Sequence, residues 1–257
     1  APSYGRGEYN DFNTFYIQSS SGTSGGSSGS PVIDIDGNVL ALNAGSRRSA
    51  ATSFFLPLDR VVRALSLLQE DEPISRGTLQ STLEHLAFDE VRRRGLRPET
   101  EAEVREAFPD ATGMLVVDEI LPKGPADGVL RPGDIIVRLD GELLTSFVPL
   151  EAALDGAVGQ PITVDVERNG EPLTLTVTVG DLHAITPSAY LEWGGSIFNP
   201  LSYQVARTNG VPVEGVVLTS RGYAMSAAGV LSSSVITHID GSPVPTLEAL
   251  EAALAAR

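Results

Sequence analysis

A motif that occurs twice in the second half of the chain restricts its fold more than any other feature. The segment GDIIVRLDGELLTSFVPLEAAL (133–154) resembles SSVITHIDGSPVPTLEALEAAL (233–254). Both segments contain an Asp-Gly pair, at 140–141 and 240–241, and both end in Glu-Ala-Ala-Leu. An apolar run, a turn and a helical pattern in the same order predict two copies of one small α+β domain.

The two copies differ beyond this motif. After the first, PITVDVERNGEPLTLTVTV (161–179) has two strand-like runs around Asn169-Gly170, a pair that favours a two-residue hairpin turn. The second copy reaches Arg257 before any such hairpin, and the chain does not open with Met, so we expect a fragment. We assign residues 71–182 to the first copy and 183–257 to an incomplete second copy.

The first 70 residues have a different pattern, typical of antiparallel strands closed by a helix. In DFNTFYIQSS, successive side chains fall on two alternating faces, as in a strand. PVIDIDGNVLALNAG has two apolar runs joined at Asp36-Gly37, which is a strong hairpin signal. TSFFLPL is a further strand-like run, LDRVVRALSLL has helical spacing, and the polar QEDEPISRG is predicted to be a linker. These segments lie at 11–20, 31–45, 52–58, 58–68 and 69–77.

Composition excludes several classes of function. A formal net charge of −15 argues against nucleic-acid binding, because polyanions bind basic surfaces. The absence of cysteine excludes disulfides, thiolate metal sites and a cysteine nucleophile, and no apolar run approaches the length of a membrane span. Asp34 and Asp36 share a strand face without a third oxygen ligand, and the stretch Gly194-Gly195-Ser196-Ile197 lacks the Lys-Ser/Thr of a phosphate loop. We therefore expect no metal, no cofactor, no nucleic-acid partner and no membrane partner.

The stretch TSGGSSGSPVIDIDG (23–37) has two interpretations, a flexible linker or a tight loop that presents a serine hydroxyl. A linker need not be followed by core-forming structure, yet Pro31 leads straight into Val32, Ile33 and Ile35. Glycines between two strands allow positive φ and close backbone approach. Backbone N–H groups can then point at an oxyanion beside an exposed hydroxyl. The flanking residues favour the loop that presents a nucleophile.

This loop and its surroundings resemble a known family. Gly26-Ser27-Ser28-Gly29-Ser30-Pro31 resembles the G-x-S-G-G/S-P signature of trypsin-like serine proteases. NVLALNAG and TSFFLPLDRVVRAL resemble the HtrA branch, including its fungal nuclear members linked to apoptosis. SRGTLQ (75–80), GVLRPGDIIVRLDG and LSYQVARTNGVPVEGVVL (201–218) resemble the PDZ domains of that branch, so the resemblance spans nearly the whole chain.

The resemblance implies a mainly β fold with α+β modules. Residues 1–70 would form the C-terminal part of a trypsin-like β-barrel with its closing helix, and the two copies would be PDZ-like domains, the second incomplete. The implied activity is that of a serine endopeptidase in protein quality control or apoptosis-linked proteolysis. The nucleus is the implied location, with the cytoplasm as an alternative, and a homo-oligomer stays open.

The resemblance also assigns roles to residues of the protease part. Ser28 would be the nucleophile, and the N–H groups of Gly26 and Ser28 would form the oxyanion hole, with Ser27 shaping the turn between them. Three further residues would flank the strand that pairs with substrate: Thr52, Ser53 and Phe54.

The chain departs from the family pattern in lacking a base before the serine. In this fold the order is His, then Asp, then Ser, but no histidine is among the 27 residues before Ser28. His85, His183 and His238 all come after it, and we expect them to be ordinary residues of the two copies. The His and Asp would come from an upstream segment, and these residues alone should not hydrolyse peptides.

The two copies imply binding of protein or peptide substrates, including free C-termini. A PDZ domain adds a peptide strand to its sheet edge while loop N–H groups hold the terminal carboxylate. Leu79 and Ile197 would line the pocket for the last side chain, or else belong to the core at a strand start. An alternative function is a PDZ-based interaction or chaperone-like module with an inactive protease half. The expected carboxylate loops are Gly77-Thr78-Leu79-Gln80 and, as its equivalent, Gly194-Gly195-Ser196-Ile197.

Overall fold

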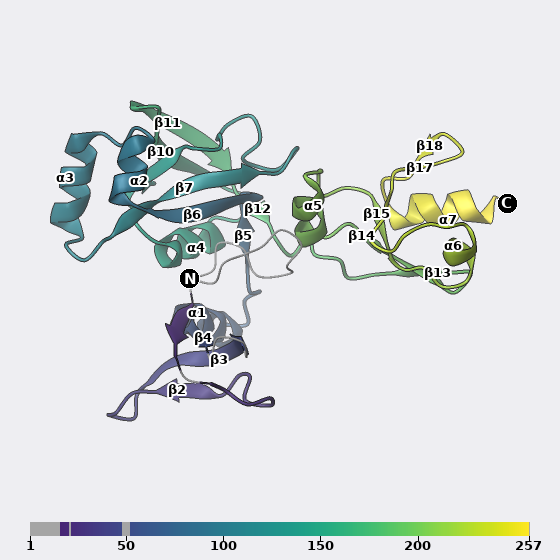
Figure 1. The fold of residues 1–257 in the computed structure, drawn as a ribbon, viewed down its shortest axis with the longest axis horizontal. Helices are drawn as coiled ribbons and strands as arrows, with labels where there is room; N and C mark the ends of the chain where they lie inside the picture. The colour runs from purple at the N-terminus through teal and green to yellow at the C-terminus, as the bar shows by residue number, and fades with distance from the viewer. Residues whose placement is uncertain (1–15, 21, 48–51, 257) are drawn as a thin grey trace.

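The computed structural model describes residues 16–20, 22–47 and 52–256, which form three successive parts (Figure 1). The first part is a four-stranded antiparallel sheet with one helix, and the other two parts are the two repeat copies. Strands dominate and helices cover them, as the predicted fold class requires. None of the helices in the described ranges is long and apolar enough to cross a bilayer.

The first part confirms the strands and the helix predicted for its described residues. Its sheet has the order β1-β4-β3-β2, and every pairing is antiparallel. The predicted strand that starts at residue 11 lies outside the described residues as far as residue 15. The elements are β1 (Ile17–Ser19), β2 (Pro31–Ile33), β3 (Val39–Arg47), β4 (Thr52–Pro57) and α1 (Leu58–Gln69).

The hairpin between β2 and β3 is built around the carboxylate of Asp34. Its Oδ1 accepts the N–H groups of Asp36 at 2.9 Å and Asn38 at 2.8 Å, and its Oδ2 accepts Nδ2 of Asn38 at 2.9 Å. The hydrogen bonds from Asn38 lower the pKa of Asp34, because donors favour the charged carboxylate. Both oxygens of this carboxylate therefore serve the turn.

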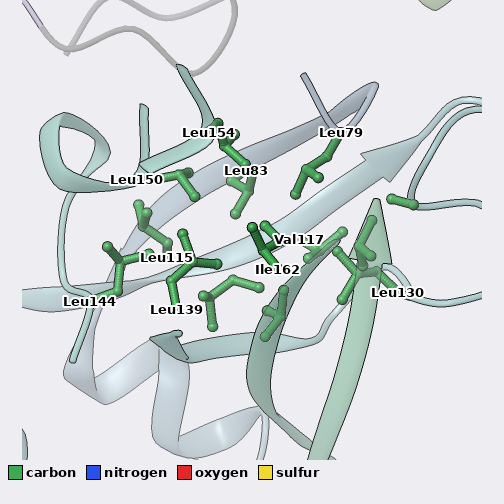
Figure 2. Close-up of a cluster of buried hydrophobic side chains, with 14 of the residues drawn as sticks. Leu79, Leu83, Leu115, Val117, Leu130, Leu139, Leu144, Leu150, Leu154 and Ile162 are labelled. Atoms are coloured by element: carbon green, nitrogen blue, oxygen red, sulfur yellow. The ribbon is translucent and has the colours of Figure 1, made fainter. Parts of the chain in front are cut away.

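The first copy is a sheet of order β11-β10-β8-β7-β6, with β9 on β8 and with β5 and β12 paired separately. The helix α4 covers one face of this sheet, and Figure 2 shows the leucines that fill the space between them. The helices α2 and α3 cover the other face. The elements are β5 (Gly77–Thr78), β6 (Ser81–Ala87), α2 (Phe88–Arg93), α3 (Pro98–Ala107), β7 (Gly113–Ile120), β8 (Ile135–Leu139), β9 (Glu142–Leu143), α4 (Phe147–Gly156), β10 (Pro161–Arg168), β11 (Glu171–Thr178) and β12 (Gly180–Asp181).

Strand β7 lies in the middle of the first copy and is buried on both faces. Leu115 and Val117 join the core under α4, whereas Met114 and Val116 join the core formed with α2 and α3. Successive side chains of a strand point to opposite faces, so a continuous apolar run suits a sheet covered on both sides. The Gly-Met-Leu-Val-Val run therefore fits an internal strand of a sheet that has helices on both faces.

The second copy repeats this plan with fewer strands. Its sheet has the order β13-β14-β15-β16, and β17 and β18 form a separate hairpin. The helix α7 contacts the apolar core through Leu250. The elements are β13 (Leu191–Trp193), β14 (Ser196–Pro200), α5 (Tyr203–Asn209), β15 (Val216–Ser220), α6 (Ala224–Ala227), β16 (Val235–Ile236), β17 (His238–Ile239), β18 (Ser242–Pro243) and α7 (Leu247–Ala255).

Two local irregularities confirm that the copies share one fold. Asp140 and Asp240 have φ angles of 48° and 49°, and each is followed by a glycine with positive φ. The β6–β7 register shifts between Thr82 and Leu83, and the β14–β15 register shifts between Ile197 and Phe198. Thr82 therefore corresponds to Ile197, and β6 corresponds to β14.

Gly113 tests how closely β6 and β7 approach. A Cβ at this position would lie 1.8 Å from the carbonyl oxygen of Leu86, and this backbone atom cannot move without separating the strands. We expect Gly113→Ala to lower the free energy of unfolding by about 3 kcal/mol. Gly156→Ala at the exposed end of α4 has open space around its Cβ and should be neutral or stabilising by about 0.5–1 kcal/mol. Urea titration of both variants checks this, and equal stabilities would contradict it.

Candidate functional site

The Gly/Ser stretch is a fixed loop, here called the serine loop (residues 24–30), and Asn43 of β3 holds it. The N–H of Gly29 donates to the carbonyl oxygen of Asn43 at 2.8 Å, and the N–H of Asn43 donates to the carbonyl oxygen of Ser30 at 2.9 Å. Nδ2 of Asn43 donates to the carbonyl oxygen and to Oγ of Ser27, both at 2.9 Å. Oγ of Ser27 in turn donates to the carbonyl oxygen of Ser24 at 2.6 Å. These bonds exclude the linker interpretation.

Ser28 lies at the exposed tip of the serine loop, next to two glycines of positive φ. Gly26 has a φ of 93° and Gly29 a φ of 82°. Among the described residues, neither the N–H of Gly26 nor the N–H of Ser28 donates to a backbone acceptor, and Ser28 Oγ makes no hydrogen bond. The loop therefore presents one hydroxyl and two uncommitted N–H groups to solvent.

Asn43 belongs to the candidate site, and the sequence analysis did not find it. Its side chain is only 6% exposed, and its Oδ1 has no hydrogen-bond partner among the described residues. A buried amide oxygen without a donor is costly. Asn43 therefore has one unused acceptor directly behind the serine loop.

The three residues expected to flank the substrate strand lie in the interior of the first sheet. Ser53 pairs with Ser19 on one side and with Ser46 on the other, so β4 offers no free edge at this point. Thr52 and Ser53 are buried, and Ser53 Oγ donates to Oγ1 of Thr23 at 3.3 Å. Any substrate strand would have to add at an edge strand, while Thr52, Ser53 and Phe54 support the sheet behind it.

The three histidines lie in the repeat copies, away from the serine loop in the fold (Figure 1). His85 is in β6, His183 comes after β12, and His238 is in β17. Partial burial lowers the pKa of His85, because desolvation disfavours the imidazolium. In the described parts of the chain, no three His, Asp or Glu side chains gather as a metal site.

A polar junction joins α1 of the first part to the first repeat copy. Arg60 forms an ion pair with Glu151 of α4. Nη2 of Arg63 donates to the carbonyl oxygen of Asp155 and to Ser75 Oγ, both at 2.8 Å. Ser75 Oγ donates to the same Asp155 carbonyl at 2.7 Å. The linker predicted at 69–77 is therefore held by the end of α4.

The expected carboxylate loop of the first copy is largely satisfied by its own side chains. The N–H of Gly77 donates to Oδ1 of Asp155 at 2.9 Å, and the N–H of Gln80 donates to Oγ1 of Thr78 at 3.0 Å. Leu79 is only 5% exposed and packs in the core beneath α4 (Figure 2). The structure thus places Leu79 in the core, while its N–H has no backbone acceptor among the described residues.

Gly77 allows this loop to pass under α4. A Cβ at Gly77 would lie 2.1 Å from the carbonyl oxygen of Leu154. Only glycine fits at such an approach of strand and helix. The glycine of SRGTLQ is therefore explained by packing against α4.

The second copy packs on the start of β6 through helix α5. Tyr203 is buried, and its hydroxyl donates to the carbonyl oxygen of Ser81 at 3.3 Å. Burial raises the pKa of Tyr203, because the phenolate would be desolvated. Leu121 of the first copy joins the core of Tyr203 and Ala206, and Lys123 Nζ lies 2.7 Å from Glu214 Oε2.

The second expected carboxylate loop begins as a hairpin turn. Gly194 and Gly195 have φ angles of 58° and 74° and connect β13 to β14, while Ser196 and Ile197 begin β14. The matching register shifts align Gly194 with Leu79, so the expected equivalence of the two loops is displaced by two residues.

Comparison with protein families identifies the two copies. A PDZ domain family model matches residues 95–179, and a PDZ-like domain model matches residues 184–256. The chain therefore carries two PDZ domains, preceded by a sheet and a helix.

Curated relatives confirm the resemblance along the chain. Protease Do-like 7 of Arabidopsis thaliana is 52% identical over 258 residues, covering 96% of this chain and 24% of that protein. Pro-apoptotic serine protease NMA111 of Eremothecium gossypii is 48% identical over 250 residues, covering 96% of this chain and 26% of that protein. By sequence the chain is thus similar to HtrA-like serine proteases, and it spans about a quarter of the length of these relatives.

A solved structure with a similar chain is the HtrA-type protease AlgW with a decapeptide. It is 25% identical, and the likeness covers 65% of this chain and 49% of that chain with a TM-score of 0.43.

Asp155 is the residue on which the junction and the first loop both depend. We expect Asp155→Ala to lower the free energy of unfolding by about 1–3 kcal/mol, because the buried N–H of Gly77 loses its acceptor. Asp155→Asn keeps an oxygen at this position and should cost less, and Asp110→Ala at an exposed turn should be neutral. Urea titrations of the three variants measure these differences. Equal losses for Asp155→Ala and Asp110→Ala would show that the contact contributes nothing.

Proposed function

We propose that the protein containing this chain is a serine endopeptidase of the HtrA type, with Ser28 as its nucleophile. The observation that carries the proposal is the serine loop, held by Asn43 with the Ser28 hydroxyl exposed and the N–H groups of Gly26 and Ser28 uncommitted. Relatives named Protease Do-like 7 and pro-apoptotic serine protease NMA111 support it.

The chemistry depends on this arrangement. A histidine outside this chain takes the proton of Ser28 Oγ as it attacks the peptide carbonyl, and an aspartate orients that histidine. The N–H groups of Gly26 and Ser28 donate to the developing oxyanion, while Ser27 keeps the turn between them. The unpaired Oδ1 of Asn43 gives the segment that carries the histidine and aspartate an acceptor to bind behind the serine loop.

The substrates are polypeptides, and the first PDZ domain contributes a further binding surface. Strand β6 ends its sheet in the described part of the chain, and an extended peptide can add to such an edge. The N–H of Leu79 lies at the start of this edge and is the donor that the loop leaves for a terminal carboxylate. The proposed setting is protein quality control or apoptosis-linked proteolysis in the nucleus, and also in the cytoplasm. Fluorescent tagging of the full-length protein tests the location, and a mass measurement in solution tests whether it forms a homo-oligomer.

Ser28 is tested by covalent labelling of the full-length protein. A fluorophosphonate reacts with an activated serine, so Ser28→Ala should abolish labelling, whereas Ser66→Ala on α1 should keep it. The isolated chain of residues 1–257 should stay unlabelled, because it has no histidine before the serine. Label that persists in Ser28→Ala would end the proposal.

A PDZ-based interaction module with an inactive protease half is the second candidate. The specific observation in its favour is that every histidine of the chain comes after Ser28 and lies in or beside one of the two repeat copies. The two functions separate in one assay of the full-length protein. Turnover of unfolded casein favours the protease, and zero turnover with an intact upstream His and Asp favours the module.

The first PDZ domain should distinguish free from blocked C-termini. A fluorescein-labelled peptide with an apolar C-terminal residue should bind about tenfold more weakly when its terminus is amidated, the factor expected for loss of one charge-assisted hydrogen bond. Fluorescence polarisation measures both affinities. The control is a peptide of scrambled sequence with an unblocked C-terminus and an acidic last residue. Equal affinities of the free and amidated forms would exclude carboxylate recognition.

A further inference from the structure

The two PDZ domains differ in what lies beside the strand that would receive a peptide. In the first domain, β6 has β7 on one side and, within residues 16–20, 22–47 and 52–256, no strand on the other. In the second domain the corresponding strand, β14, lies between β15 and β13. The edge of β14 that corresponds to the open edge of β6 is therefore already paired with β13.

The strand that pairs with β14 runs in the direction that a bound peptide would take. Leu191 pairs with Phe198 and Trp193 pairs with Ser196, so β13 is antiparallel and its C-terminal end meets the start of β14. A PDZ ligand must likewise place its terminal carboxylate at the loop before this strand. At the point where a peptide would end, the chain instead continues through Gly194 and Gly195.

The partly buried side chain of Leu191 packs against the apolar core that contains Phe198 of β14 and Leu250 of α7. In the first domain, Leu79 fills the corresponding position beneath α4. Gly194, which aligns with Leu79, has no side chain to fill it, so Leu191 supplies the apolar volume from the added strand.

The turn that returns the chain to β14 is fastened to the rest of the domain. Oγ of Ser196 donates to the carbonyl oxygen of Arg221 at 2.5 Å, and the N–H of Ala224 donates to the carbonyl oxygen of Gly194 at 3.2 Å. A side-chain contact lies just before β13, where Nδ2 of Asn199 donates to the carbonyl oxygen of Ala189 at 3.1 Å. The added strand itself is β13, residues 191–193, here called the cis strand.

We propose that the cis strand is a built-in ligand of the second PDZ domain. It occupies the backbone edge of β14 and packs against the apolar core that contains Leu250 of α7, so this domain takes no peptide in trans. The expected carboxylate loop at Gly194–Ile197 then serves as the turn of an internal ligand. In this chain, peptides then bind at β6 of the first domain and not at β14 of the second. This difference between the two domains rests on the proposed peptide-binding function.

Photo-crosslinking in the full-length protein with Ser28→Ala tests this division. The probe is a synthetic peptide with a free C-terminal valine and a benzophenone side chain near its end, and mass spectrometry locates the cross-links. The wild-type second domain should give none on β14 or α7. Leu191→Glu should release the cis strand, because it puts a charge in the apolar core. Cross-links to β14 and α7 should then rise to about tenfold or more above the background signal.

Tyr190→Glu is the matched control, because Tyr190 is the neighbouring residue and is 66% exposed. It should leave the cross-links unchanged. Cross-links on β14 or α7 in the wild type would overturn the proposal, and so would a folded Leu191→Glu variant without any gain.

Hydrogen exchange of the unsubstituted protein gives a second measurement that needs no variant to fold. The backbone amides of β13 that face β14 should exchange as slowly as those of β14, and exchange of these amides at the rate of an unstructured peptide would overturn the proposal. If the probe cross-links to neither domain of the wild type, peptide capture by the first domain fails. Hydrogen exchange and the Leu191→Glu gain still decide the cis strand separately.

Discussion

Unpaired backbone N–H and C=O groups at the edge of a sheet bind any extended chain that reaches them, and both PDZ domains are built around such an edge. In the first domain, β6 ends the sheet within the described ranges, and Tyr203 of the neighbouring domain donates to the carbonyl of Ser81 at its start. In the second domain, β13 pairs with the matching strand. The same fold therefore offers a ligand site in one copy and fills it in the other.

Each functional loop of the chain is held by a side chain from a distant part of the sequence. Asn43 holds the serine loop through Ser27, and Asp155 holds the N–H of Gly77. The carbonyl of Asp155 also receives Arg63 from α1, so the end of α4 connects the protease helix to the first PDZ domain. A movement of α4 would displace both the linker at 69–77 and the loop at Gly77–Gln80, because both are hydrogen-bonded to Asp155.

Much of the fold could be predicted from local patterns. The Asp36-Gly37 and Asn169-Gly170 turns, the helix from Leu58 and the repeated motif are all confirmed by the structure. Turn residues and hydrophobic period act over a few positions, so they can be read without knowing the rest of the chain. The resemblance to HtrA-like proteases and the two PDZ domains is likewise confirmed.

The candidate site was less accessible to sequence reasoning. The nucleophile assigned to Ser28 stays a prediction, and the residues that hold its loop were missed, because the bonds of Asn43 to Ser27 join separate elements. The sequence analysis made Gly77–Gln80 equivalent to Gly194–Ile197. The matching register shifts instead align Gly194 with Leu79, which is two residues away from the expected alignment. A strand register depends on both partners, and neither strand's sequence contains it alone.

The sequence by itself determined the repeat, the turns and the strand–loop–hairpin setting of Ser28, because these depend on residue type and short spacing. Only the tertiary structure decided which edges are open and which donors are already bound. The run from Leu191 to Trp193 could have continued outward, as β5 does in the first domain, or folded back on β14. Folding back packs Leu191 against a core that draws on Phe198 of β14 and Leu250 of α7, so residues far apart in the sequence take part in it.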